Sequence, residues 1–116
     1  MTVHTILLIQ KTNSRSTRTW FDYSTVALAT EAIIAMHEAR LTEQYPNLSH
    51  INYSVDQLLS FIDEHQEFHA LVYDQNLKAY MPRDRNWVKE KVVGHLRRNL
   101  QQQNSMELDQ PTKEKL

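Results

Sequence analysis

The chain has 116 residues, of which 41% are hydrophobic and 23% are charged, and its formal net charge is −1. This composition is typical of one globular domain. The absence of cysteine excludes disulfides, thiolate metal sites and cysteine nucleophiles, and a single glycine, Gly94, excludes glycine-rich phosphate-binding loops. No stretch approaches the roughly 20 apolar residues of a membrane span, and the N-terminus lacks a secretory-signal pattern.

The first part of the chain predicts two strands and a long helix. Residues 5–9 form an apolar run of strand-favouring residues, and residues 18–21 form a second, more amphipathic strand. A helix is expected next, capped by one of three polar residues, Asp22, Ser24 or Thr25. Its apolar positions recur at helical spacing and comprise Val26, Ala29, Ile33, Met36, Leu41 and Tyr45. Pro46 ends this helix.

A second helix and a strand hairpin follow. The motif Ser54-x-x-Gln57 is a capping box, in which each side chain accepts a hydrogen bond from a backbone N–H of the other residue, and it predicts a helix start. Residues 70–73 then favour a strand, Gln75-Asn76 supplies a turn, and residues 78–81 return as a second strand.

The end of the chain predicts a third helix. Pro82 ends the preceding strand, and Asp84 is placed to cap a basic helix that opens at Asn86. The element order β-β-α-α-β-β-α favours an α+β fold with a four-stranded antiparallel sheet and three helices on one face. Residues 1–103 are predicted to form the domain, and residues 104–116 a flexible polar tail.

The apolar strands predict a homodimer. Residues 6–9 are apolar without alternation, so both faces of this strand favour burial. Three helices in so short a chain can cover one face of the sheet but hardly both. The other face, carrying either Ile6 and Leu8 or Leu7 and Ile9, therefore needs a second molecule. The polar C-terminal tail is the alternative cover, but it offers little apolar surface.

The hairpin extends this predicted interface. A two-residue turn at Gln75-Asn76 would pair Tyr73 with Lys78 and Leu71 with Tyr80. These pairs place Leu71, Tyr73 and Tyr80 on one common face. The two tyrosines are expected at the rim of the dimer interface, because each can bury its ring and keep its hydroxyl in water.

Several segments, in one order and at matching spacing, resemble the enhancer of rudimentary homolog family over residues 3–103. They are His4–Gln10, Arg18–Tyr23, Leu58–Glu64 and Ala70–Arg98. The resemblance implies a homodimer without known enzymatic activity or cofactor, which pairs through its sheets with Ile6 and Leu8 in the interface.

The resemblance also implies a function. Family members are adaptors that bind short, otherwise disordered segments of RNA-processing and transcription proteins, and they are linked to splicing, small-RNA maturation, mRNA elimination and the cell cycle. A nuclear location, with the cytoplasm as a second one, is therefore expected. Trp20, Tyr23 and Trp87 are predicted partner-binding anchors, because aromatic residues beside short loops often carry binding energy. Simple core or edge packing is the alternative for each. The edge strand at residues 77–81 could also accept a peptide by strand addition.

One phosphorylation candidate is Thr19, because Asp22 stands three residues later, as acidophilic kinases require. A structural role in the sheet is the alternative. The resemblance supports Thr19, since family members carry a casein-kinase-type acceptor there. A second family acceptor aligns with Thr25, but position 28 is leucine and not an acid, so that site does not keep the pattern.

Candidate catalytic chemistry is sparse. His65 and His69 have ligand-like spacing only on a continuous helix, and a strand must begin near residue 70, so no metal site is predicted. Asp63 and Glu64 are adjacent and would point apart on a helix, so they do not form an acid–base pair. His37 and His95 are expected to be satisfied residues at the edges of apolar faces. An enzyme that uses these histidines is the weakest alternative.

Direct RNA binding is a further alternative function. Between Arg83 and Arg98 basic residues outnumber acidic ones, which favours either compensation of acidic neighbours or contact with phosphates. The sheet face would have to stack bases, as some RNA-binding domains do. The aliphatic Ile6 and Leu8 suit that role poorly, so the adaptor is the preferred prediction.

Overall fold

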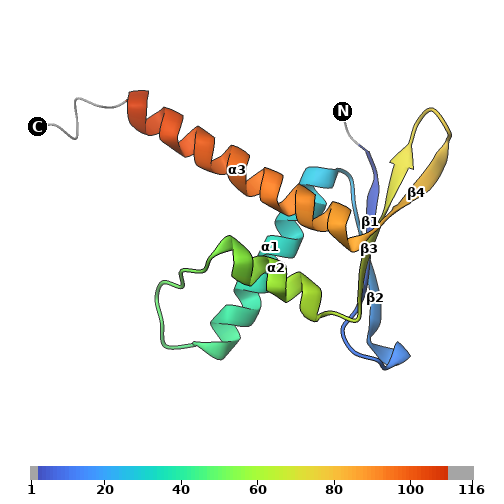
Figure 1. The fold of residues 1–116 in the computed structure, drawn as a ribbon, viewed down its shortest axis with the longest axis horizontal. Coiled ribbons are helices and arrows are strands. Elements are labelled where there is room, and N and C mark those ends of the chain that lie inside the picture. Colours follow the sequence, from blue (N-terminus) through green and yellow to red (C-terminus); the bar gives the residue numbers. More distant parts are fainter. Residues whose placement is uncertain (1–2, 110–116) are drawn as a thin grey trace, which may run out of the picture.

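The computed structural model describes the backbone of residues 3–109 and the side chains of residues 3–99. Its elements, in chain order, are β1 (Thr5–Gln10), a 3-10 turn η1 (Arg15–Thr17), β2 (Arg18–Tyr23), α1 (Val26–Gln44), α2 (Val55–Glu64), β3 (Glu67–Asp74), β4 (Ala79–Arg83) and α3 (Arg85–Asp109). The predicted order and the α+β class are confirmed. All three helices lie on the same side of the sheet, and α3 extends away from it (Figure 1). None of the described helices is long and apolar enough to span a bilayer.

The sheet is antiparallel throughout, in the strand order β2-β1-β3-β4. The two apolar strands, β1 and β3, occupy the centre, where each makes hydrogen-bond ladders on both edges. The amphipathic β2 and the proline-containing β4 lie at the edges, where a missing N–H is tolerated. The apolar composition of β1 and β3 thus accounts for their central position, and the polar residues of β2 and the proline of β4 account for their position at the edges.

The core lies between the helices and one face of the sheet. β1 contributes Leu7 and Ile9, and β3 contributes Phe68 and Ala70, all almost completely buried. The helices close this layer with Ala29, Ile33, Leu58, Phe61, Ile62, Val88 and Val92. Of the two alternatives for β1, the structure therefore places Leu7 and Ile9 under the helices, and Ile6 and Leu8 on the other face.

Each helix begins at a polar cap. The Thr25 hydroxyl accepts a hydrogen bond from the Leu28 N–H at 3.0 Å, which identifies Thr25 as the cap of α1. Both hydrogen bonds of the predicted Ser54–Gln57 capping box are present at α2. The Asp84 carboxylate accepts from the Trp87 N–H at 2.9 Å and caps α3. Sequence-based prediction of these starts is confirmed, because caps depend on local residues alone.

The predicted register of the hairpin is wrong. Tyr73 pairs with Tyr80, and Leu71 pairs with Pro82, so β4 continues through the proline that was expected to end it. The connection is four residues long and not two. The Asp74 carboxylate accepts from two successive backbone N–H groups of the loop, and Lys78 adopts a left-handed φ of 53°. The error is two residues, so the predicted common face of Leu71, Tyr73 and Tyr80 is retained.

Two predictions for the helices also need correction. Tyr45 was expected on the apolar side of α1, but it is the exposed C-terminal cap of that helix. His37 was expected at the edge of that side as a satisfied residue, but it is buried, with both ring nitrogens lacking a hydrogen-bond partner.

The backbone of α3 is helical to Asp109, across the predicted boundary at residues 103 and 104. The division into domain and tail stays a prediction, and residues 110–116 lie outside the described chain.

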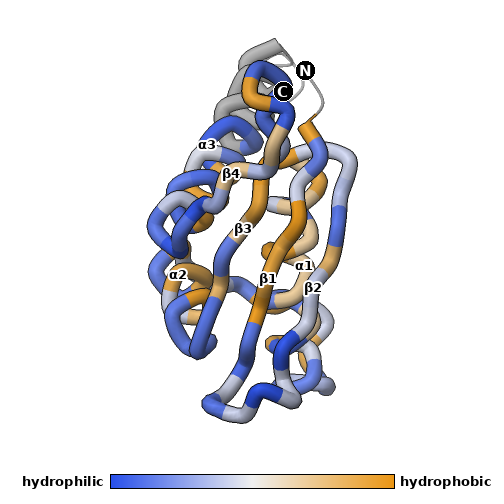
Figure 2. The backbone as a smooth tube through the Cα atoms, turned by 90° about the vertical axis from the view of Figure 1, so that its right-hand side faces the viewer, coloured by the Kyte–Doolittle hydropathy of each residue, from blue (hydrophilic) through white to orange (hydrophobic). Residues whose placement is uncertain are grey.

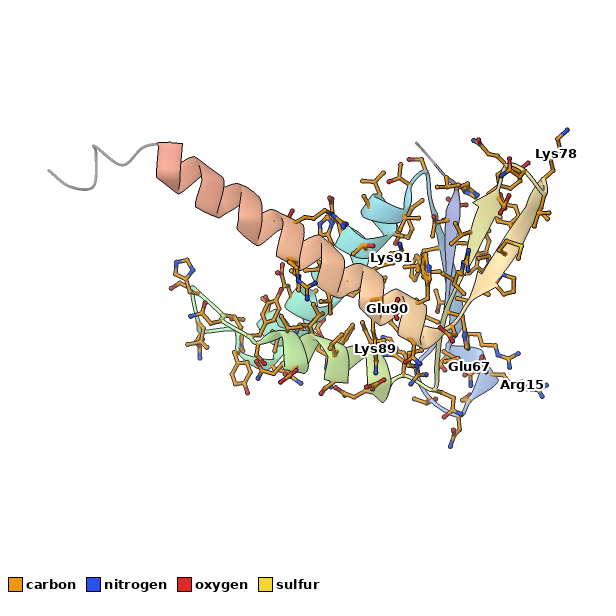
Figure 3. All side chains as sticks on the ribbon, turned by 45° about the horizontal axis from the view of Figure 1, so that its top comes forward. Arg15, Glu67, Lys78, Lys89, Glu90 and Lys91 are labelled. Atoms are coloured by element: carbon orange, nitrogen blue, oxygen red, sulfur yellow. The ribbon has the colours of Figure 1, made fainter. Side chains whose placement is uncertain are left out.

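Ion pairs and hydrogen bonds connect the start of α3 to α2 and to the two residues that follow α2. Lys89 lies between α3 and α2 (Figure 3), with its ammonium 2.6 Å from the Asp63 carboxylate. The Arg85 guanidinium donates to the backbone carbonyls of Asp63, His65 and Gln66. Part of the basic character of α3 therefore compensates an acidic neighbour, which is the first of the two roles considered from the sequence.

Candidate protein-interaction surface

One face of the sheet has no helix over it, among the residues that the structure describes. We call this the uncovered face, and in the observed register it comprises Ile6, Leu8 and Gln10 of β1, Arg18, Trp20 and Asp22 of β2, Glu67, His69, Leu71 and Tyr73 of β3, and Tyr80 and Pro82 of β4. Figure 2 looks onto the sheet from this side, with the helices behind it. The hydrophobic tube segments of β1 and β3 run through the middle of the view.

The uncovered face exposes large apolar side chains. Leu8 is 36% exposed, Tyr80 is 42% exposed and Trp20 is 64% exposed, while Ile6, Leu71 and Tyr73 are partly buried by their neighbours. A contiguous apolar patch of this kind marks an interaction site more often than a solvated surface. All five residues predicted for the dimer interface, Ile6, Leu8, Leu71, Tyr73 and Tyr80, lie on this face, and their burial in a dimer stays a prediction.

A polar network closes one end of this face. His4 Nδ1 is hydrogen-bonded to the Tyr80 hydroxyl at 2.7 Å, and His4 Nε2 lies 4.0 Å from the Asp22 carboxylate. The ring of Tyr80 also packs edge-on against Tyr73, with centroids 5.3 Å apart. Tyr80 belongs to β4, His4 immediately precedes β1, and Asp22 belongs to β2, so the network spans the width of the sheet. It fixes the orientation of Tyr80 at this end of the sheet.

The three predicted partner-binding aromatics are not brought together. Trp20 lies on the uncovered face opposite Leu8. Tyr23 packs on the helix side, where burial, and to a smaller degree the nearby Asp22 carboxylate, raises the pKa of its hydroxyl. Trp87 sits in the first turn of α3 and packs against the core, with the charged groups of Arg83 and Lys91 5.9 and 5.4 Å from its ring centroid. A single groove anchored by all three is therefore absent from residues 3–99.

A groove that the sequence did not predict lies between the edge of β2 and the helices. Its volume is about 620 Å³. The apolar part of its lining is Ile9, Phe21, Met36 and Phe61, and the polar part is Lys11, Thr19, Arg40, Glu43, Gln44, Glu64 and His65. The sequence signal that could have pointed to it is the pair Trp20-Phe21, because neighbours in a strand occupy opposite faces, and Phe21 is indeed exposed beside the groove.

Thr19 lies on the rim of this groove. Its hydroxyl is exposed and donates a long hydrogen bond, 3.4 Å, to the Thr17 carbonyl. Exposure suits a kinase acceptor, and phosphorylation of Thr19 stays a prediction. Thr25, by contrast, uses its hydroxyl as the cap of α1.

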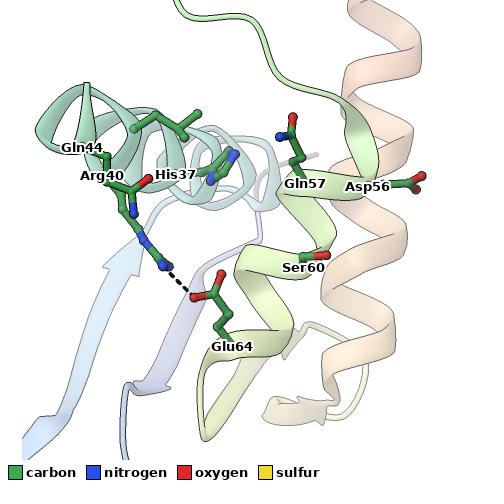
Figure 4. A pocket seen from close by; sticks show the side chains of 8 residues that line it. His37, Arg40, Gln44, Asp56, Gln57, Ser60 and Glu64 are labelled. Atoms are coloured by element: carbon green, nitrogen blue, oxygen red, sulfur yellow. Dashed lines mark hydrogen bonds and ion pairs between the residues drawn. The ribbon is translucent and has the colours of Figure 1, made fainter. Parts of the chain in front are cut away.

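A second pocket of about 300 Å³ lies between α1 and α2 (Figure 4). The guanidinium of Arg40 spans it to reach the Glu64 carboxylate at 2.6 Å. His37 lies at its α1 wall and Ser60 at its α2 wall.

His65, at the end of α2, and His69, on the uncovered face, do not converge, and no group of three metal-ligating side chains occurs in the part of the chain described here.

The fold and its surfaces define a small α+β domain built on a four-stranded sheet that is covered on one face only. A family model described as "Enhancer of rudimentary" matches residues 1–102, and the chain belongs to this family. It is 43% identical over 95 residues to an enhancer of rudimentary homolog of Arabidopsis thaliana, covering 82% of this chain and 87% of that protein.

Two further relatives are similarly complete. A homolog from Dictyostelium discoideum is 41% identical over 95 residues, covering 82% of this chain and 95% of its own length. The protein enhancer of rudimentary of Drosophila virilis is 37% identical over 94 residues, covering 81% and 90%. The sequence-based assignment to this family is confirmed, and none of these names describes an enzyme.

Proposed function

We propose that this chain is a non-catalytic homodimeric adaptor of nuclear RNA-regulatory complexes, with the cytoplasm as a second location. Two copies pair through their uncovered faces, and each copy holds a short segment of an RNA-processing or transcription protein. One observation carries the proposal: β1 and β3 present apolar side chains on both faces of the sheet, while the described helices cover only one. Family membership supports the same reading.

The energetics of the uncovered face favour a second copy. Full burial of a leucine, isoleucine or aromatic side chain stabilises by about 1.5–3 kcal/mol. The uncovered face offers several such side chains, Ile6, Leu8, Trp20, Leu71, Tyr73 and Tyr80, of which Leu8, Trp20 and Tyr80 are exposed. A symmetric dimer uses the same patch twice, so two copies of a bound segment are held together and gain avidity for their own target.

The mass of the purified chain tests pairing. We expect twice the subunit mass of 13.7 kDa by size-exclusion chromatography with light scattering. The double variant Ile6→Arg, Leu8→Arg should be monomeric or insoluble, because burying two unpaired guanidinium groups costs several kcal/mol. The matched control is Leu48→Arg with Leu77→Arg, which adds the same charge at two exposed positions away from the sheet centre and should keep the dimer. A wild-type mass near 13.7 kDa contradicts the proposal.

The partner class is tested by co-purification from cells that express the full chain. The tagged wild type should enrich proteins of RNA processing or transcription and be found in the nucleus. Phe21→Glu, which puts a charge into the groove beside β2, tests whether that groove holds the segment; Leu48→Glu, at an exposed loop position, is the control. Enrichment of unrelated metabolic proteins, identical for wild type and variants, would speak against an adaptor for RNA regulation.

Direct RNA binding is the second candidate function. The structure adds one observation in its favour that the sequence analysis did not contain. Besides its aliphatic centre, the uncovered face carries the rings of Trp20, His69, Tyr73 and Tyr80, together with Arg18. Aromatic rings on a sheet can stack bases. This function needs the same surface as the dimer, so the two candidates exclude each other at that face.

Fluorescence anisotropy with a short single-stranded RNA at two salt concentrations separates the candidates. For the adaptor, we expect weak binding that falls steeply with added salt, because a few basic side chains contribute only counterion release. Sub-micromolar affinity at physiological salt that is lost on mutating Tyr73 or Tyr80 would establish direct recognition in its place.

A further inference from the structure

Five aromatic rings pack in a continuous series beneath α1 and α2. We call it the ring stack, and it runs Tyr53–His37–Phe61–His65–Phe68, with successive centroids 4.8, 5.1, 4.9 and 5.1 Å apart. The rings come from α1, from the segment before α2, from α2 and its C-terminal cap, and from β3. The stack thus joins α2 to both of its neighbours, and every second ring within it is a histidine.

Both histidines are buried. His37 is 5% exposed and His65 is 8% exposed. Neither ring nitrogen of His37 has a hydrogen-bond partner. His65 makes one hydrogen bond, from Nδ1 to the backbone carbonyl of Phe61 at 2.9 Å. Figure 4 shows His37 on the side of α1 that faces α2. In this packing His37 behaves as a neutral ring that fills space, and a positive charge there would be buried without a partner.

The charged groups around the stack do not supply such a partner. On α1, the Glu38 carboxylate accepts a hydrogen bond from the Tyr53 hydroxyl at 2.6 Å, and Arg40 lies near Phe61 and forms an ion pair with Glu64. On α2, Asp56 lines the adjacent pocket. Lys11 faces His65 from the segment after β1, and Arg85 of α3 donates to the His65 carbonyl. Glu38 and Glu64 therefore bind Tyr53 and Arg40, and among the described residues no carboxylate forms an ion pair with His37.

We propose that the ring stack is an acid-sensitive contact: protonation of His37 and His65 releases α2 from α1 and β3. The connection before α2, residues 45–54, has no helix or strand and is mostly exposed, so α2 can separate without breaking the sheet. Phe61 and His65 also line the groove beside β2, so this opening removes one wall of the groove. The proposal does not depend on dimerisation or on a particular partner.

The direction of the pH effect follows from burial. Burial lowers the pKa of His37, and Arg40 lowers it further, against smaller opposing effects of Glu38 and Glu64. Burial also lowers the pKa of His65, with the hydrogen bond to the Phe61 carbonyl opposing it. The open state, in which both histidines reach water, therefore binds more protons than the closed state. The contact is fully stable above the ordinary histidine pKa of about 6.5 and weakens as the pH falls below it.

Hydrogen exchange of the full chain between pH 7.5 and pH 5, corrected for intrinsic rates, tests the proposal. Each histidine that stays uncharged in the closed state raises the opening constant of α2 about 30-fold at pH 5. We expect α2 amides to exchange through this opening, while β1 amides remain better protected. Equal protection of α2 and β1 at every pH, or α2 protection that does not change with pH, would overturn the proposal.

Variants assign the effect to His37. His37→Leu keeps the apolar volume and removes the titrating group, so its α2 opening constant should rise about 30-fold less than that of the wild type over the same pH range. His37→Phe, which also keeps a ring between Tyr53 and Phe61, serves if the leucine variant does not fold. His50→Gln, in the exposed loop before α2, is the control and should respond as the wild type does. A wild-type pH response in both His37 variants would refute the role of this residue.

Discussion

The two faces of the sheet are built from similar apolar residues but lie in different surroundings: the described helices cover one face and leave the other exposed. Along β1, Leu7 and Ile9 are buried under the helices, whereas Ile6 and Leu8 lie on the uncovered face, where Leu8 remains 36% exposed. Hydropathy alone therefore does not distinguish the two faces of this strand. A central strand that is apolar on both faces indicates two covering layers, and the described chain supplies only one. This difference is the physical basis of the proposed dimer.

The largest effect is expected on the helix-covered face. Phe68→Ala removes a fully buried ring that packs against His65, and it should lower the free energy of unfolding by about 3–5 kcal/mol. Leu8→Ala, on the uncovered face, should cost the subunit itself less than about 1 kcal/mol, since Leu8 is partly in water there. Urea denaturation at a concentration where both are compared as monomers measures the difference. Equal costs would remove the contrast between the faces.

The concentration dependence of unfolding sharpens the contrast. If two uncovered faces pair, a tenfold increase in protein concentration should raise the apparent stability of the dimer by about 1.4 kcal/mol. Ile6→Arg with Leu8→Arg should abolish this dependence, whereas Phe68→Ala should be less stable and still show it. A denaturation midpoint for the wild type that is unchanged over a hundredfold range of concentration would contradict pairing.

A smaller effect is expected at the helix that completes the covered face. Asp84→Ala removes the carboxylate that caps α3 and should cost about 1 kcal/mol in unfolding free energy. Asp84→Asn keeps an oxygen acceptor at the same place and serves as the control, which should lower the unfolding free energy by only about a few tenths of a kcal/mol. The dimer mass should be unchanged in both, because the cap lies in the helical layer. Loss of the dimer in Asp84→Ala would mean that the two layers are coupled.

Local sequence signals were sufficient to predict the order of the elements, but they did not predict the register of the hairpin. The caps Ser54 and Asp84 act on backbone groups within three residues, and the apolar runs of β1 and β3 differ clearly from their flanks. The hairpin register, in contrast, depends on two hydrogen bonds to the Asp74 carboxylate and on the left-handed backbone of Lys78. A sequence with two plausible turn residues at positions 75 and 76 does not reveal either feature.

The surfaces were predictable only in part. Because successive side chains of a strand point to opposite faces, only two sets of β1 residues could form the uncovered face, and the resemblance selected the set that the structure leaves uncovered. The groove beside β2 brings together side chains of β1, β2, α1 and α2, so no stretch of sequence encodes it. The burial of His37 likewise depends on Tyr53 and Phe61, which lie 16 and 24 residues away, through ring contacts that helical periodicity does not contain.

The smallest effect is expected from removing residues 101–116, and it decides what covers the uncovered face. This segment is polar in sequence, with few apolar residues to bury. Its removal should change the unfolding free energy by less than roughly 1 kcal/mol and leave the dimer mass, corrected for the shorter chain, unchanged. Light scattering and urea denaturation on the truncated chain measure both quantities. A larger loss of stability, or a dimer that appears only after truncation, would mean that the C-terminal segment covers the sheet within its own subunit. The alternative cover considered from the sequence would then replace the second copy, and Ile6 and Leu8 would belong to an intramolecular core.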